Sequence, residues 1–308
     1  MKKDKKIDVV GIGANVCDTL IVLPAYTEED KKQKADSVGR AGGGPCGTGL
    51  VAAAKLGCSA AYIGQLSTDA DGVFLKQDFE AYGVSTEHIR IRDGYQSFVS
   101  FVMLSQASGS RTIVFDRGTL PPTVLDEAQK QAIRDAGVLL VDGNDLAAAI
   151  EGATVARESG TIVVYDAGGL YEGVENLLPL VDYLIPSEEF ALKHTGCDDA
   201  QHAARVLFER YHPRAVVITQ GSRGGVFFDG KCLRAYPVMP AHVVDSNGAG
   251  DVFHGAYTAA LTRGYDAYTA CLFSSAVSAL KCEKIGSRAG VPDLSTTLQF
   301  LKEQGYEL

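Results

Sequence analysis

The residues most capable of chemistry lie at 245–251, where the chain reads D-S-N-G-A-G-D and runs directly into an apolar segment. Gly248 and Gly250 allow the main chain to turn sharply and to expose successive N–H groups. Residues 249–263 carry apolar side chains at helical spacing, so a helix is predicted to begin at this turn. Unpaired N–H groups and the helix dipole both favour an anion there. Asp251, in the first helical turn, would stand beside that anion, which suits the attack of a hydroxyl on a phosphate.

Asp251 is therefore the predicted catalytic carboxylate, which aligns and deprotonates the attacking hydroxyl. The main-chain N–H groups of Gly248, Ala249 and Gly250 would stabilise the charge of the transferred phosphoryl group. The helix N-terminus is expected to keep Asp251 ionised and to lower its basicity. That is acceptable because a loose phosphoryl-transfer transition state requires mainly alignment. The structural alternative is an aspartate that only stabilises the start of a helix.

Two further glycine-rich segments could approach a ligand. Residues 41–48 read A-G-G-G-P-C-G-T ahead of a helix predicted over 45–56. They would let a ligand come close to the backbone, or else form a turn that packs on the sheet. Residues 219–225 read T-Q-G-S-R-G-G after a predicted strand. They suit a hairpin turn and a nucleotide-phosphate site at the carboxyl ends of parallel strands equally well.

Several other functional classes fit the motifs poorly. Gly11-x-Gly13 after the first predicted strand suggests a nicotinamide-dependent oxidoreductase, but the third glycine of that fingerprint is Val16. A strand is also predicted where the fingerprint requires a helix. The sequence has no GxxxxGK[ST], HExxH or GxSxG motif. Its six histidines lack metal-ligand spacing and are interpreted mostly as surface or polar-edge residues.

Composition indicates an ordinary globular protein with small-molecule partners. The 308 residues carry a net charge of −9, which argues against nucleic acid or an anionic membrane surface as the main partner. No apolar run approaches the roughly 20 residues that a membrane span needs. The seven cysteines are scattered, odd in number and without a CxxC pair, so reduced thiols in a cytoplasmic protein are expected.

The order of predicted elements indicates an α/β fold. Residues 7–13 form an apolar first strand, and from residue 138 onward apolar strands alternate with helices. This alternation predicts a mostly parallel central sheet flanked by helices on both faces, hence three layers. Two stretches interrupt it, at about 16–40 and 95–117, and the second contains two β-rich segments around a turn at 105–110. We expect one domain over 1–308, with these stretches forming a small β-sheet lid.

The motifs together resemble the ribokinase/PfkB family of carbohydrate kinases, over roughly residues 7–301. The family pattern D-T-x-G-A-G-D corresponds to residues 245–251, with Ser246 in place of Thr. The pattern G-G-x-x-x-N-x-A followed by L-G corresponds to residues 43–48 and 56–57, with Thr48 in place of Asn. Residues 42–48, 250–256 and 281–282, with the strand at 109–114, are similar to a subset that includes ketohexokinases and sulfofructose kinases.

The resemblance implies a ribokinase-like three-layer fold and roles at matching positions. It implies that sugar hydroxyls are bound by Asp18, Gly43, Gly44 and Thr48, and that Arg111 of the lid reaches the phosphate. It implies that the nucleotide is bound by Ser187, Glu188, Thr219, Gly221, Gly224 and Ser275. It also implies ATP, Mg²⁺ and a possible K⁺ site near Asp245, Asn247 and Gly286. Lys281 and Lys284 stand close to that loop, and the family's N-x-x-E motif is replaced by residues 187–190, S-E-E-F.

The expected function is an ATP-dependent sugar kinase that phosphorylates a primary hydroxyl of a ketohexose-type, fructose-like substrate. The alternatives are a pentose or nucleoside kinase, and a sugar-binding homologue impaired in catalysis because of the altered S-E-E-F segment. Because lid strands often pair between subunits in this family, the resemblance also implies a homodimer through the lid.

Overall fold

The structure is a computed structural model that describes residues 5–108 and 110–308. A nine-stranded sheet forms the centre of this part of the chain. Gly109, which the sequence analysis placed in the turn of the lid, lies outside the described residues. The strand order is β15 (Leu233–Tyr236), β14 (Gly225–Phe228), β13 (Ala215–Thr219), β12 (Tyr183–Pro186), β11 (Ile162–Ala167), β10 (Ala136–Val141), β1 (Ile7–Ile12), β4 (Ala60–Tyr62) and β6 (Val84–Ser85). All neighbours from β13 to β6 pair in parallel, whereas β13–β14 and β14–β15 are antiparallel. The predicted mostly parallel sheet is therefore confirmed.

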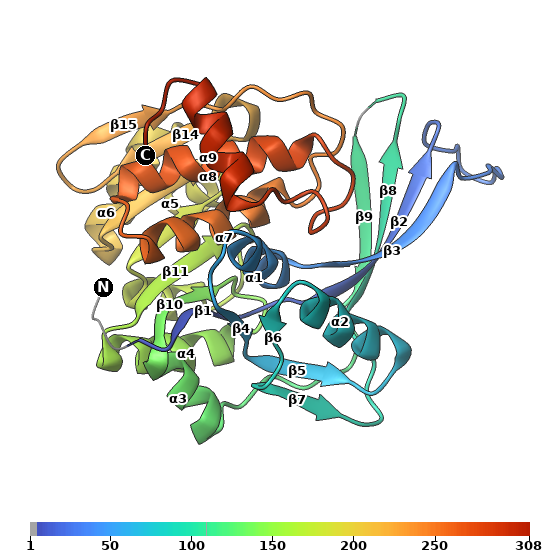
Figure 1. Ribbon diagram of the computed structural model, residues 1–308, viewed down its shortest axis with the longest axis horizontal. Coiled ribbons are helices and arrows are strands. Elements are labelled where there is room, and N and C mark those ends of the chain that lie inside the picture. Colours follow the sequence, from blue (N-terminus) through green and yellow to red (C-terminus); the bar gives the residue numbers. More distant parts are fainter. Residues whose placement is uncertain (1–4, 109) are drawn as a thin grey trace.

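Helices cover both faces of this sheet and give the predicted three layers (Figure 1). One apolar cluster joins the sheet to α1 (Pro45–Lys55), α2 (Ala70–Ala81), α7 (Ala249–Thr262), α8 (Ala267–Cys282) and α9 (Leu294–Glu303). The other joins it to α3 (Glu127–Asp135), α4 (Leu146–Ser159), α5 (Glu188–Thr195) and α6 (Ala200–Tyr211). Strands such as β10 are buried at every position because both faces are covered. Short 3₁₀ turns lie at Val174–Asn176, Leu178–Leu180 and Gly221–Arg223.

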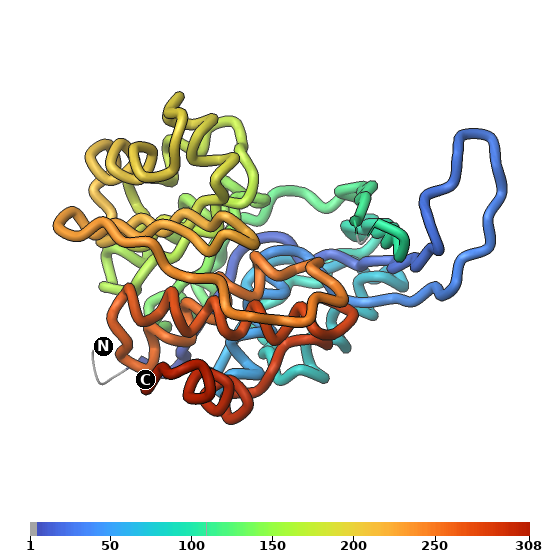
Figure 2. The backbone as a smooth tube through the Cα atoms, turned by 90° about the horizontal axis from the view of Figure 1, so that it is seen from above, coloured from blue at the N-terminus to red at the C-terminus, as the bar shows by residue number. Residues whose placement is uncertain are grey.

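A separate four-stranded sheet stands apart from this body, as predicted from the two interrupting stretches (Figure 1). Its order is β3 (Ser37–Gly43), β2 (Val16–Leu23), β8 (Val99–Ser105) and β9 (Arg111–Asp116). Figure 2 shows the loop between β2 and β3 extending away from the body. A third sheet pairs β5 (Gly64–Ser67) with β7 (Ile89–Arg92). We call the four-stranded sheet the lid sheet; its action as a lid stays a prediction.

The glycine-rich segment at 41–48 was only partly anticipated. Gly42 and Gly43 end strand β3, and Gly44 caps α1 with a left-handed φ of 85°, followed by Pro45 at the start of the helix. From the sequence, residues 41–48 were expected either to approach a ligand or to form a turn that packs on the sheet, and neither interpretation includes a strand. β3 has weak strand propensity, so its existence depends on antiparallel pairing with β2, which a local pattern does not show.

Among residues 5–108 and 110–308, no helix is long and apolar enough to cross a lipid bilayer.

Candidate active site

The predicted anion turn begins helix α7 as expected. Gly248 is its N-cap with a left-handed φ of 74°, and a side chain there would lie within 2.4 Å of Ser287 Cβ. A side chain at Gly250 would meet no atom within 4 Å, so the first turn of α7 faces open space. Asp245 stabilises the turn because its Oδ1 accepts a hydrogen bond of 2.8 Å from the main-chain N–H of Asn247. The turn thus presents the N–H groups of a helix start to a ligand.

Asp251 lies in the first turn of α7, partly buried among other acids. Burial raises its pKa to about 7, assisted by the negative charge of Asp166. Asp142 and Asp18 act in the same direction, and His254 opposes them. The expectation that the helix N-terminus lowers the basicity of Asp251 is therefore wrong, because desolvation and like charge outweigh the dipole. A carboxylate with this pKa is a better proton acceptor at neutral pH.

The sequence analysis missed the buried groups beneath Asp251. Asp142 directly follows β10, and its carboxylate accepts hydrogen bonds from the N–H groups of Ala14 (2.8 Å), Cys46 (3.0 Å) and Asn144 (2.8 Å). Asp166 is the penultimate residue of β11, and its Oδ1 accepts a 3.1 Å hydrogen bond from the N–H of Gly168. Their positions at the carboxyl ends of neighbouring parallel strands were the available signal.

The side chain of His254 is buried, whereas the histidines were interpreted mostly as surface or polar-edge residues. Its Nδ1 lies 2.6 Å from the carbonyl oxygen of Gly250, and its Nε2 lies 3.0 Å from the carbonyl oxygen of Ile185. Burial lowers the pKa of His254. The ring therefore links the first turn of α7 to the end of β12.

A cavity of about 710 Å³ opens beside the start of α7. Seven of the predicted site residues line it: Arg111, Thr219, Gly221, Gly224, Ala249, Gly250 and Ser275. Much of the remaining lining is apolar and includes Tyr236, Val238, Met239, Pro240 and Phe253. A volume in this range with a few polar groups on apolar walls is typical of a small-molecule site. Most of the predicted phosphate and nucleotide residues thus share one cavity, which is not lined by Gly248, Asp251, Ser187 or Glu188.

The two interpretations of residues 219–225 are both compatible with the structure. β13 and β14 form an antiparallel hairpin there, so the segment is a hairpin turn. Gly224 is left-handed with a φ of 79°, and a side chain would come within 2.2 Å of the carbonyl oxygen of Tyr236. The same turn also lines the cavity.

Ser187 and Glu188 lie next to this turn without lining the cavity. Ser187 caps α5 by accepting a 3.1 Å hydrogen bond from the N–H of Phe190, and it bridges to Thr219. The carboxylate of Glu188 accepts a 2.7 Å hydrogen bond from Gln220 Nε2 and pairs with Arg223. Glu188 is thus already bound to protein partners. Glu188 could therefore affect nucleotide binding only indirectly, by fixing the turn at residues 219–225 that lines the cavity.

Arg111 connects the lid sheet to the anion turn. It begins β9, and its Nη1 donates a 3.2 Å hydrogen bond to Ser246 Oγ. Because Arg111 also lines the cavity, its guanidinium stands beside the N–H groups at the start of α7. This is a suitable position for a group that stabilises phosphate charge.

The predicted sugar ligands surround the root of the lid sheet. Asp18 of β2 is buried, and its Oδ1 accepts a 2.6 Å hydrogen bond from Ser100 Oγ. Burial raises its pKa. A side chain at Gly43 would lie 2.0 Å from Asp18 Oδ2, and one at Gly44 would lie 2.6 Å from the carbonyl oxygen of Ala14. The glycines therefore permit close packing around Asp18.

Arg288 is a buried charge near this site that the sequence analysis did not identify. Its Nη1 donates to Asp78 Oδ2 at 2.5 Å, and its Nη2 donates to Asn15 Oδ1 at 2.7 Å and to the carbonyl oxygen of Gly43 at 2.6 Å. Its guanidinium also lies 4.9 Å from the centre of the Phe79 ring. Arg288 thus joins the C-terminal loop to α2 and to the end of β3.

Thr48 does not contact open space. It is fully buried in α1, and its Oγ1 has no hydrogen-bond partner among the described residues.

A second cavity of about 300 Å³ is lined by Asn15, Gln65, Arg117 and Asn144, among others. None of the predicted sugar ligands lines it. Asn15 Nδ2 is buried without a hydrogen-bond partner among the described residues.

Gly11 and Gly13 have packing roles that need no dinucleotide. A side chain at Gly11 would lie 2.6 Å from Cys46 Sγ, where α1 packs on β1. A side chain at Gly13 would lie 2.3 Å from Asp142 Oδ1. After Gly13 the chain forms strand β2 and not a helix, as expected from the sequence.

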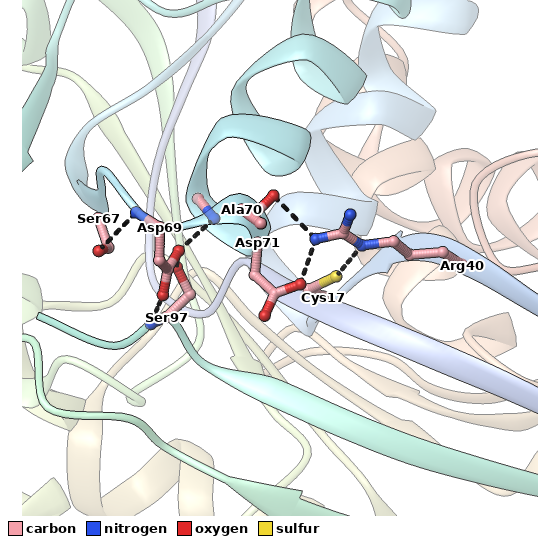
Figure 3. Close-up of polar contacts among 8 residues, drawn as sticks. Cys17, Arg40, Ser67, Asp69, Ala70, Asp71 and Ser97 are labelled. Atoms are coloured by element: carbon pink, nitrogen blue, oxygen red, sulfur yellow. Dashed lines mark hydrogen bonds and ion pairs between the residues drawn. The ribbon is translucent and has the colours of Figure 1, made fainter.

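Polar contacts fix the lid sheet to helix α2 (Figure 3). Arg40 of β3 donates a 2.9 Å hydrogen bond to the carbonyl oxygen of Ala70, pairs with Asp71 and contacts Cys17 Sγ at 3.1 Å. Asp69, the N-cap of α2, accepts hydrogen bonds of 2.7 Å from the N–H and the Oγ of Ser97. These contacts hold β3 and the residues just before β8 against the start of α2.

The fold and this arrangement define a class of protein: an α/β enzyme with an anion turn, a buried carboxylate and a nucleotide-sized cavity. The chain matches the family described as pfkB family carbohydrate kinase over residues 6–294. The protein therefore belongs to the pfkB family and is a carbohydrate phosphotransferase.

Individual relatives agree with this assignment over nearly the whole chain. A ribokinase of Haemophilus influenzae is 27% identical over 299 residues, covering 94% of this chain and 97% of the relative. A 5-dehydro-2-deoxygluconokinase of Shouchella clausii is 26% identical, covering 98% of both chains. The solved structure of Arabidopsis thaliana ribokinase with ribose and ATP has a TM-score of 0.85 at 23% identity, covering 96% of this chain and 99% of that one. The predicted ribokinase-like fold is confirmed.

Proposed function

We propose that this protein is an ATP-dependent kinase that transfers the γ-phosphate to a primary hydroxyl of a small sugar. The observation that carries the proposal is the joint placement of the anion turn and Arg111 at one cavity, with Asp251 on the same helical turn as Gly250. Asp251 aligns and deprotonates the sugar hydroxyl. The N–H groups of residues 248–250 and the guanidinium of Arg111 stabilise charge on the phosphoryl oxygens.

The 710 Å³ cavity is the proposed ATP site. Its apolar wall, which includes Val238, Met239 and Phe253, suits the adenine ring, and Ser275 lies on the same wall from α8. Thr219, Gly221 and Gly224 would lie along the phosphates. Mg²⁺ would accompany the ATP phosphates and offset their charge. No group of three or more His, Cys, Asp or Glu that could hold a metal occurs in the described part of the chain.

The proposed acceptor is a pentose of the ribose type. The relatives support a sugar kinase and include a ribokinase that this chain covers almost completely, whereas they do not support the fructose-like substrate expected from the sequence. Asp18 and the main chain at Gly43 and Gly44 would bind its hydroxyls on the lid side of Asp251. The negative charge of Asp18 raises the pKa of Asp251, which supports placing both carboxyl groups at one acceptor site.

A turnover assay tests this function directly. ADP release from ATP and Mg²⁺ is measured with ribose, fructose, further pentoses and hexoses, and adenosine, using the wild-type chain and Asp251→Asn. We expect sugar-dependent ADP release with the highest kcat/KM for a pentose, and its near loss in the variant. A sugar that raises Tm without any ADP release would support the sugar-binding alternative and contradict the proposal.

We also propose that two copies pair through the lid sheet. Apolar side chains are exposed on its strands, among them Phe101 of β8 and Ile113, Val114 and Phe115 of β9. β3 and β9 are its outermost strands and carry unpaired backbone groups, which protein association often covers. Sedimentation should show a dimer, and Phe101→Ser with Val114→Ser should weaken it. A monomer at all accessible concentrations would refute this pairing.

A further inference from the structure

Lys281 is a fully buried charge directly behind the anion turn. It belongs to α8, and its side chain is 0% exposed. Its Nζ donates a 2.8 Å hydrogen bond to the carbonyl oxygen of Asp245 and lies 3.8 Å from Asp245 Oδ2. A charged ammonium is rarely buried without a partner, because desolvation is costly. Here Asp245 supplies both a carbonyl oxygen and a carboxylate.

The ammonium stands where the sequence analysis expected K⁺. That expectation used Asp245, Asn247 and Gly286. In the structure the main-chain N–H of Asn247 donates to Asp245 Oδ1 at 2.8 Å, and the N–H of Gly286 donates to Asp245 Oδ2 at 2.9 Å. N–H groups aimed at the carboxylate cannot ligate a cation. The remaining oxygen of Asp245, its main-chain carbonyl oxygen, accepts the hydrogen bond from Lys281.

A K⁺ ion bound to the oxygens of Asp245 would touch the ammonium of Lys281. Two like charges at contact distance repel strongly in a buried site, where little water screens them. The residues at this position therefore do not fit a bound monovalent cation. The side chain of Lys281 already supplies one positive charge at the same oxygens.

Asp245 links Lys281 to the anion turn, so the position of Lys281 affects the position of that turn. Asp245 precedes Ser246, which accepts the hydrogen bond from Arg111, and Gly248, which begins α7. Through Gly286 the carboxylate also holds the loop whose Ser287 packs against Gly248. A displacement of Asp245 would move the N–H groups of the turn relative to the phosphate.

We propose that Lys281 is a covalently tethered monovalent cation that positions the anion turn, so that the enzyme needs no K⁺. This inference rests on the proposed function only where activity is measured. Lys281 does not line the cavity and acts through Asp245, so it is a positioning residue. Losing its ammonium group leaves the carbonyl oxygen of Asp245 without its hydrogen-bond donor and creates a vacancy that an added cation fills.

The first experiment uses the wild-type enzyme. Its kcat is measured in buffers containing only bulky cations such as choline, then with K⁺, Na⁺ or NH₄⁺ added at constant ionic strength. We expect the same kcat in all of them. Activation that saturates with K⁺ concentration would overturn the proposal, and this result does not depend on the folding of any variant.

The second experiment uses Lys281→Met, which keeps most of the side-chain volume, with Lys284→Met as the matched control. Lys284 is exposed just after the end of α8. We expect Lys281→Met to lose about 10²-fold in kcat, since small misplacements of catalytic groups have effects of this size. K⁺, NH₄⁺ or methylammonium should restore part of the loss, with little change in KM for ATP. Lys284→Met should behave like the wild type.

A binding measurement separates this proposal from the proposed function. The Tm of each protein is followed while K⁺ replaces choline at constant ionic strength, without substrates. K⁺ should raise the Tm of Lys281→Met and leave the Tm of the wild type and of Lys284→Met unchanged. A folded Lys281→Met that responds to K⁺ neither in Tm nor in kcat would refute the tethered cation, whatever the substrate is.

Discussion

His254 Nδ1 lies 3.1 Å from Asp166 Oδ2, beneath the first turn of the helix that carries Asp251. The same nitrogen lies 2.6 Å from the carbonyl oxygen of Gly250, and Nε2 lies 3.0 Å from that of Ile185. Both ring nitrogens thus face oxygen acceptors. Burial raises the pKa of Asp166 well above its usual range and lowers that of His254. Asp166 raises the pKa of Asp251 and His254 lowers it, so the charges of these neighbouring groups influence one another.

The first prediction concerns the charge of Asp166. Because Asp166 raises the pKa of Asp251, Asp166→Asn should lower it. The acid limb of kcat/KM should then shift to lower pH, while the protein stays folded. The pH profile of kcat/KM for both proteins measures this. Asp198→Asn, at an exposed loop position, is the control and should leave the profile unchanged. A shift of the acid limb to higher pH in Asp166→Asn would contradict the electrostatic argument.

The second prediction concerns Asp251 as the proton acceptor. Its pKa of about 7 requires kcat/KM of the wild type to rise with pH and to level off above that value, because only the ionised carboxylate accepts a proton. Asp251→Asn should keep the fold and the affinity for ATP but lose about 10²–10⁴-fold in kcat. Steady-state kinetics and nucleotide titration measure the two effects. An unchanged kcat in a folded variant would remove Asp251 from the mechanism.

The sequence predicted the main sheet and the anion turn well, because their signals are local. Buried apolar strands such as β10 alternate with helices, and residues 245–251 combine glycines with a helix start. These features depend on near neighbours in the chain. The predicted helix at 249–263 agrees with α7 to within one residue.

The sequence did not predict groups whose role depends on distant contacts. His254 meets Ile185, 69 residues away, and Arg288 meets Asn15, 273 residues away. Neither contact can be predicted from the spacing of residues along the chain. The pKa of Asp251 was likewise mispredicted, since its neighbours Asp142 and Asp166 come from other strands. The carboxyl ends of β10 and β11 offered the only local hint.

The third prediction concerns Arg111. Its guanidinium should stabilise the transition state through the phosphate, so Arg111→Ala should lower kcat by about 10²-fold and leave Tm nearly unchanged. Arg210→Ala, on α6, is the control because Arg210 lies over the ring of Tyr211 and does not line the cavity. Kinetics and thermal unfolding measure both variants. An effect of Arg111→Ala on Tm alone would make the residue structural.

The fourth prediction compares two glycines of β3. A methyl group at Gly43 would lie 2.0 Å from Asp18 Oδ2, whereas one at Gly39 would meet no atom within 4 Å. Gly43→Ala should therefore displace the carboxylate of Asp18 and raise the KM for the sugar, with a smaller change in the KM for ATP. Gly39→Ala should leave both constants at the wild-type values. Equal sugar KM values for the two variants would show that Asp18 does not bind the sugar.

The fifth prediction concerns the buried pair of Arg288 and Asp78, whose atoms lie 2.5 Å apart. The side chains of Arg288 and Asp78 are 2% and 15% exposed, respectively. Removing one partner leaves an uncompensated charge in a poorly hydrated site, which typically costs about 3–5 kcal/mol. Arg288→Gln should therefore lower the free energy of unfolding, measured by urea denaturation, by an amount of this order.

The double variant separates loss of charge balance from loss of packing. Asp78→Asn combined with Arg288→Gln removes both charges, so it should be more stable than the sum of the single variants predicts. Arg288 also donates to Asn15 and to the carbonyl oxygen of Gly43, and those two hydrogen bonds are lost in both Arg288 variants. The recovery should therefore be partial. Strict additivity of the two single changes would mean that Asp78 is not the group that balances the charge of Arg288, and that the acceptors at the sugar site carry its stabilising effect.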